Sequence, residues 1–130
     1  MWRELFDFII ATARHRNRVL RELGLTPNDS RALNSLGAGQ GRTMRSLAAE
    51  WQCDASTATW IVDRLAKRHL VDRRTSPDDR RVTLVSLTPR GAKAKARMVR
   101  GVYTPPPELL ELSAEELAAL RDAAAKLKRR

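Results

Sequence analysis

Four arginines lie close to one predicted turn, and their chemistry suits the binding of a polyanion. Arg73 and Arg74 precede the turn, whereas Arg80 and Arg81 follow it directly. A hairpin with arginines at its tip fits the narrow minor groove of DNA, whose negative potential attracts guanidinium groups. Asp79 stands beside them, where phosphate would repel its carboxylate. Two interpretations of Asp79 remain open: it holds an arginine in a bidentate pair, or it only favours the turn.

Small hydroxyl-bearing residues and one large aromatic residue form a second chemical feature. The outer face of a helix predicted from Ala55 to Arg68 carries Ser56, Thr57, Thr59, Trp60 and Arg64. Small side chains let a helix approach DNA closely, and hydroxyl groups bond to phosphates or base edges. Taken alone, this pattern fits the corner of a helical bundle equally well.

The sequence offers no group of residues for catalysis or metal binding. One cysteine and two histidines cannot build a Cys/His zinc site, and no glycine-rich phosphate loop is present. We therefore expect no enzyme activity, no metal and no cofactor. Cys53 is predicted to be a small buried residue rather than an oxidation sensor, and His69 a helix cap. We expect His15 to be solvent-exposed; the alternative is a cavity for an anionic effector, shared with Arg14 or Arg18.

The distribution of charge locates the expected binding surface. The 130 residues contain 25 Lys and Arg against 15 Asp and Glu, a formal net charge of +10. Residues 41–100 hold 14 basic and six acidic groups, whereas residues 101–130 hold five of each. Such an excess in the middle of a small chain predicts contact with nucleic acid, here double-stranded DNA.

Length and composition limit the class of protein. The length predicts a single domain over 1–130, and 42% hydrophobic residues suffice for a core. A lone cysteine excludes a disulfide framework within the chain. No apolar run approaches the roughly 18–20 residues of a membrane span, and the N-terminal segment does not fit a signal peptide. We expect a cytoplasmic protein with no membrane partner.

Hydrophobic spacing and capping residues predict a mainly helical chain. A helix-turn-helix at 46–68 precedes a β-hairpin, because apolar residues repeat at helical spacing in the first segment and nearly alternate in the second. The other predicted elements are helices over 2–23, from Thr26 and Pro27 onward, over 88–103 and over 114–128, an extended piece at 42–44, hairpin strands at 70–75 and 81–87, and a stiff polyproline segment at 105–107.

The first and last predicted helices carry apolar stripes. Phe6, Ile9 and Ile10 share one face of the first helix, and Leu117 and Leu120 begin a narrow seam on the last. An apolar seam at the end of a small chain has few apolar residues of the same chain left to pack against. We therefore expect these helices to pair in a homodimer.

Residues 23–98 resemble the MarR family of winged helix-turn-helix transcriptional regulators. The matching segments are LGLTP at 23–27, LAA at 47–49, VDRL at 62–65, LV at 70–71 and DDRRVTLVSLTPRG at 78–91. The resemblance implies a mainly α fold with a small β-hairpin wing. It implies that residues 26–87 form the DNA-binding part, and that 1–25 and 88–130 hold the dimerisation helices.

The resemblance also assigns roles to residues. It implies that Ala55–Arg68 is the recognition helix, with Ser56, Thr57, Thr59 and Trp60 at DNA-facing positions. It makes Arg73–Leu87 the wing, in which Asp79 braces Arg81, and it gives Arg64 a partly structural role. Members of the family commonly repress, and small phenolic or aromatic acids often release them from DNA. For this chain we expect a near-palindromic operator bound by the dimer and release by a small aromatic or anionic ligand.

The sequence departs from the family at several positions. His69 stands where Gly usually supplies a left-handed backbone, and Trp60 where a basic or polar residue is common. The prolines at 105–107 interrupt the usual long penultimate helix. Two alternatives to a ligand-released repressor remain: an effector-independent architectural DNA-binding protein, or a winged-helix module for protein contacts. The arginines of the wing argue against the module.

Overall fold

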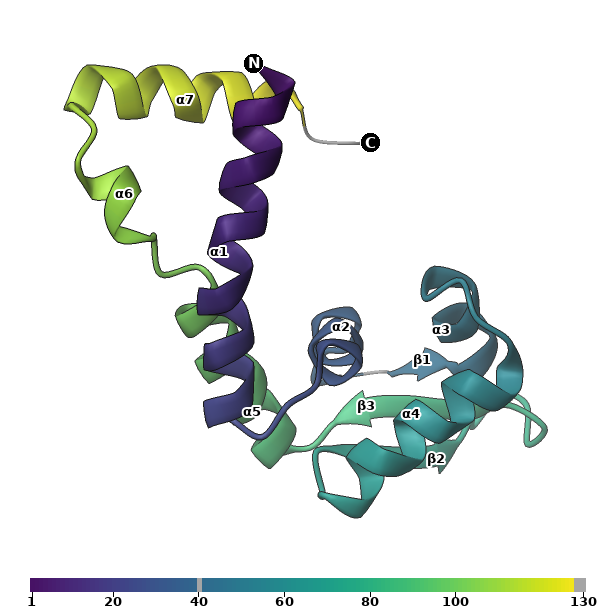
Figure 1. Ribbon diagram of the computed structural model, residues 1–130. Helices are drawn as coiled ribbons and strands as arrows, with labels where there is room; N and C mark the ends of the chain where they lie inside the picture. Colours follow the sequence, from purple (N-terminus) through teal and green to yellow (C-terminus); the bar gives the residue numbers. More distant parts are fainter. Residues whose placement is uncertain (40, 128–130) are drawn as a thin grey trace.

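A computed structural model describes residues 1–39 and 41–127 and shows helices arranged around a small antiparallel sheet (Figure 1). The predicted mainly helical fold with a β-hairpin is confirmed. Within the described residues, no helix has the length and apolar character that a membrane span requires. In chain order the elements are α1 (Trp2–Glu22), α2 (Pro27–Ser35), β1 (Arg42–Thr43), α3 (Met44–Glu50), α4 (Ala55–Lys67), β2 (Val71–Thr75), β3 (Thr83–Leu87), α5 (Pro89–Val102), α6 (Pro107–Leu110) and α7 (Ala114–Lys126).

The sheet has the strand order β1-β3-β2, and both pairings are antiparallel. In the predicted hairpin, Arg73 lies opposite Val85 and Thr75 opposite Thr83. The extended piece predicted at 42–44 forms the outer strand β1, in which Arg42 lies opposite Val85. The third strand ties the start of α3 to the hairpin, so the wing and the helix-turn-helix share one backbone hydrogen-bond network.

The core forms where α2, α3 and α4 meet the sheet. Ala58, Ile61, Val62 and Leu65 are the predicted inner face of α4, and all four are buried. They pack in one cluster with residues of α2, α3 and β3, among them Leu33, Leu47 and Val85. Burial of each large aliphatic side chain contributes about 1.5–3 kcal/mol. This burial fixes which face of α4 points outward.

A close backbone contact joins α5 to the end of the helix-turn-helix. Thr88 caps α5 by accepting the N–H of Gly91 at 2.9 Å, and its own hydroxyl donates to the carbonyl of His69 at 2.6 Å. A Cβ on Gly91 would lie 1.8 Å from the Leu70 carbonyl oxygen. Only glycine permits this approach, which sets where α5 leaves the sheet.

His69 terminates α4 in the left-handed conformation, with φ of 60°. The N–H of His69 donates to Ala66 at 3.0 Å and that of Leu70 donates to Leu65 at 3.0 Å, the bonding pattern of a Schellman cap. The prediction that His69 is a cap residue is confirmed. The protein therefore accepts at His69 the strain that glycine would avoid.

The segment after α5 differs from the prediction. The sequence predicts one stiff extended piece over the three prolines, but the extended backbone ends at Pro106, and Pro107 begins the short helix α6. Proline suits the first helical position because its fixed φ is helical and its missing N–H would have no partner. The predicted end of the last helix at Lys128 lies outside the described residues.

The terminal helices expose the apolar stripes that the sequence predicted. α1 packs along α5, and α7 lies away from the sheet (Figure 1). Phe6, Ile9 and Ile10 are 48%, 46% and 57% exposed. None of the 13 described residues of α7 is buried.

Replacing His69 with glycine is expected to raise the free energy of unfolding by about 1 kcal/mol, since glycine adopts a positive φ without the steric cost that histidine carries. Urea unfolding at a fixed protein concentration measures the change. Lys67→Gly, two residues earlier inside α4, is the matched control and should lower the same free energy by about 1 kcal/mol. A His69→Gly variant less stable than the wild type would contradict this account of the cap.

Candidate nucleic-acid interface

The first turns of α4 present small polar side chains to the surface. The Asp54 carboxylate caps the helix by accepting the N–H of Thr57 at 2.7 Å. This backbone hydrogen bond lowers the pKa of Asp54 below its usual value, and the Thr57 hydroxyl adds to the effect. The predicted DNA-facing residues of these turns are all exposed: Ser56, Thr57, Thr59 and Trp60. A shallow depression of about 400 Å³, here called the α4 hollow, is lined by Ala55, Ser56, Thr59, Trp60 and Asp63.

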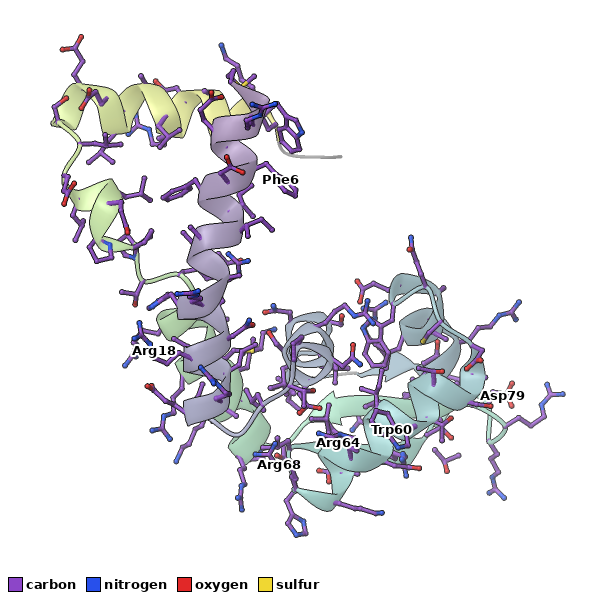
Figure 2. All side chains as sticks on the ribbon, viewed as in Figure 1. Phe6, Arg18, Trp60, Arg64, Arg68 and Asp79 are labelled. Atoms are coloured by element: carbon purple, nitrogen blue, oxygen red, sulfur yellow. The ribbon has the colours of Figure 1, made fainter. Side chains whose placement is uncertain are left out.

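Trp60 and Arg64 lie together on the outer face of α4 (Figure 2). The Arg64 guanidinium carbon is 5.1 Å from the centroid of the Trp60 ring, within the range of a cation–π contact. Its Nη2 atom is 3.2 Å from Oδ2 of Asp29, a residue of α2 that is 1% exposed. Arg64 therefore neutralises a buried carboxylate, which supports the partly structural role that the resemblance implied.

Asp79 and Arg81 form the bidentate pair at the tip of the hairpin. The Arg81 Nε and Nη2 atoms donate to Oδ1 and Oδ2 of Asp79 at 3.2 and 3.4 Å. The Arg81 backbone N–H also donates to Oδ1 at 3.0 Å, and this bond, followed by the guanidinium, lowers the pKa of Asp79. The two interpretations of Asp79 are thus both correct, because one carboxylate forms the turn and braces the arginine. The Arg81 side chain remains 91% exposed.

The other predicted arginines of the hairpin occupy different positions. Arg73 and Arg74 lie within β2, and only Arg80 joins Arg81 at the exposed turn. Arg73 forms an ion pair with Asp63 of α4, and Arg74 donates to the Gly39 carbonyl at 2.9 Å. These contacts hold α4 and Gly39, which precedes β1, to strand β2.

Arg45 is a basic residue that the sequence analysis missed. It lies in the first turn of α3, is exposed, and borders with Arg81 a depression of about 320 Å³ whose other residues are Thr43, Met44, Val82 and Thr83. The available signal was its place two residues after the Thr43 cap, where the outer face of the first turn is exposed. Arg45 and Arg81 therefore line the same depression, although 36 residues separate them in the chain.

Comparison with known proteins identifies the family. The family model described as MarR family matches residues 23–82. YsmB of Bacillus subtilis, an uncharacterised HTH-type transcriptional regulator, is 30% identical over 125 residues, which cover 92% of this chain and 83% of YsmB. The chain belongs to the MarR family.

Solved structures share the fold of this MarR-family chain. Apo MarR from E. coli superposes with a TM-score of 0.79 at 25% identity, covering 99% of this chain and 97% of that one. A mutant of S. aureus MepR bound to an oligodeoxyribonucleotide gives 0.76 at 21% identity, covering 98% and 95%, and this likeness concerns the fold alone. The chain spans about half the length of two other curated relatives, 53% and 48%. All of these curated relatives are transcriptional regulators, which agrees with the prediction that the chain is not an enzyme.

Two side chains considered in the sequence for ligand binding or oxidation, His15 and Cys53, are half-buried. His15 was predicted to be solvent-exposed, and this is wrong: it is half-buried, with Nε2 3.2 Å from the carbonyl oxygen of Gly101 in α5. Cys53 is half-buried against the core, in agreement with its prediction as a small packing residue. Among the described residues, no three His, Cys, Asp or Glu side chains are placed to hold a metal ion.

Asp54→Asn is expected to leave stability at pH 7 nearly unchanged, because Asn and Asp are equally good N-caps. In acid the two proteins should diverge. Since the folded-state pKa of Asp54 is lowered, its contribution is complete above its usual pKa of about 3.9 and disappears as pH falls through the lowered value. Thermal melting from pH 7 to about pH 2 should show a steeper acid loss in the wild type. Parallel acid curves for both proteins would exclude a role for the Asp54 charge.

Proposed function

We propose that this MarR-family chain is a DNA-binding transcriptional regulator that represses from a near-palindromic operator as a homodimer. The observation that carries the proposal is the arginine at the wing tip, Arg81, whose guanidinium donates to Asp79 and is still almost fully exposed. An exposed guanidinium fixed on a hairpin suits the minor groove, where sequence-dependent narrowing concentrates negative potential. In this proposal residues 26–87 are the DNA-binding part of a single domain over 1–130, and the protein works in the cytoplasm on the chromosome.

The recognition helix enters the major groove in the proposed complex. The first turns of α4 expose Ser56, Thr57, Thr59 and Trp60, and their small size supports close approach of the helix backbone. Arg73 and Arg64 support this surface through their ion pairs with Asp63 and Asp29. Arg74, Arg80 and Arg45 add positive charge around the wing, where phosphates flank the groove.

The exposed apolar stripes of α1 and α7 support a homodimer. In the proposed assembly the helices of residues 1–25 and 88–130 pair with those of a second copy and cover Phe6, Ile9 and Ile10. A two-fold axis then places two recognition helices on one face, about 34–36 Å apart, which corresponds to half-sites one helical turn apart.

A groove along α1 supports release by a small aromatic or anionic ligand. It has a volume of about 310 Å³, at the lower end of typical small-molecule sites, and brings Arg14, His15 and Arg18 beside Phe8 and Pro106. Guanidinium groups beside a ring and a proline suit an aromatic acid. Among the alternatives from the sequence, an effector-independent architectural protein would keep its DNA affinity when such acids are added.

Arg81→Ala is expected to weaken binding to duplex DNA by at least about tenfold, ~1.4 kcal/mol, since the minor-groove contact is lost. Lys126→Ala removes an exposed charge from α7 and should change affinity by less than about twofold. Gel shifts of both variants at one fixed salt concentration make the comparison. Equal losses of DNA affinity in the two variants would refute the assigned wing. A DNA affinity that does not change with salt concentration would favour the protein-contact module.

Light scattering at micromolar concentration is expected to give twice the 14.7 kDa mass of the chain, because a monomer would leave the α1 and α7 stripes in water. Footprints on a bound duplex should then protect two half-sites. A monomeric mass from a protein with intact helical circular dichroism, or protection of one half-site, would contradict the dimeric arrangement.

A further inference from the structure

The groove-facing part of α4 has no long side chain of the kind that usually reads bases. Between residues 55 and 63 it contains no Arg, Lys, Asn or Gln, the residue types that make bidentate contacts to guanine and adenine. Asp63, the one carboxylate able to accept from cytosine, is paired with Arg73 of the wing. What α4 offers to base edges is therefore hydroxyl groups and the indole of Trp60.

Trp60 is contacted by Arg64 of the same helix, and Arg64 is anchored by Asp29 of α2. Trp60 is 55% exposed, and the Arg64 guanidinium stacks over its ring at 5.1 Å. Arg64 is in turn held by Asp29, whose Oδ2 also accepts the backbone N–H of Thr26 at 2.9 Å. Because Asp29 is buried in the N-terminal capping box of α2, the guanidinium that covers the indole has a fixed anchor.

The small and apolar side chains that line the α4 hollow beside Trp60 suit the binding of a methyl group. Ala55, Ser56 and Thr59 form its small-residue side, and the indole supplies an apolar side. Thymine alone among the four bases presents an apolar group, its C5-methyl, in the major groove. Guanine and adenine present polar edges there, for which the hollow has hydroxyl groups and the carboxylate of Asp63, which is paired with Arg73.

We propose that Trp60 is the specificity-determining residue of this recognition helix and takes thymine C5-methyl groups, while Arg64 and Asp29 are positioning residues that hold the indole for that contact. The inference rests on the proposed function, since it concerns how the same helix reads duplex DNA. It assigns T·A pairs to the base positions that face the α4 hollow. It also gives Arg64 a role other than DNA binding: because its charge is already paired with Asp29, Arg64 positions the indole of Trp60.

The test begins with duplexes selected from a random library by the full-length protein. Both half-sites of the selected sequence are expected to contain fixed T·A pairs. Deoxyuridine then replaces thymine at those pairs, which removes only the methyl group. Wild-type affinity should fall by about three- to fivefold for each methyl that is buried. Deoxyuridine at thymines outside the half-sites is the control for altered DNA shape and should change affinity by less than about 1.5-fold.

Trp60→Ala should bind the thymine duplex more weakly and lose the discrimination, with a thymine-to-uracil affinity ratio near one. Its binding to random duplex and its dependence on salt should stay close to the wild type, because phosphate contacts are retained. A wild type indifferent to the methyl group, or a Trp60→Ala variant that still discriminates, overturns the proposal.

Arg64→Lys tests the positioning role without removing charge. Lysine can pair with Asp29 but lacks the planar group that stacks on the indole, so the thymine-to-uracil ratio should fall toward one. Arg31→Lys, the same change at an exposed residue of α2, should keep the wild-type ratio. Asp29→Asn should resemble Arg64→Lys if it folds. An Arg64→Lys variant with the full wild-type ratio refutes the positioning role whatever the outcome for Asp29→Asn.

The outcomes separate this inference from the proposed function. If the protein selects no duplex sequence and binds no DNA, both fail together. If it selects a sequence whose half-sites lack fixed T·A pairs, or one insensitive to deoxyuridine, the regulator function stands and thymine recognition is refuted.

Discussion

The contact between α2 and α4 depends on one buried carboxylate. Asp29 is 1% exposed, and a charge in such a place is tolerated only when polar partners replace the water it has lost. Thr26 supplies a backbone N–H and Arg64 supplies a guanidinium. Thr26 precedes the first turn of α2, and Arg64 lies on the outer face of α4. The one carboxylate therefore connects the start of α2 to α4.

An ion pair also joins the wing to α4. Arg73 of β2 pairs with Asp63 of α4, and β1 adds a third strand to the hairpin. Gly91 permits α5 to cross directly over the Leu70 carbonyl. The surfaces proposed for the two DNA grooves are therefore fixed relative to each other through the sheet, while Arg81 at the tip stays exposed.

The terminal helices α1 and α7 leave large apolar side chains exposed. α1 contributes Leu20 to the core, but its N-terminal half and α7 keep large apolar side chains in water. The half-buried His15 links α1 to α5 where these two regions meet. A ligand bound beside His15 would lie between α1 and the segment that begins α6, both within the part proposed for dimerisation. Small changes in the angle of these helices would alter the separation of the two α4 helices in a dimer.

The sequence by itself determined every element whose signal is local. The periodicity of Ala58, Ile61 and Leu65 identified the buried face of α4, and capping residues located most helix starts, because these signals span only a few neighbouring residues. The sequence missed α6, since three consecutive prolines fit an extended segment and a helix start equally well.

Only the tertiary structure decided what the polar outer residues do. Helical spacing places Arg64 on the outer face, but not beside a carboxylate 35 residues earlier in the chain, and it cannot bring His15 to the carbonyl of Gly101. Long side chains of this kind find their partners through the packing of the apolar core, which the local pattern predicts for each helix separately and not for the helices together.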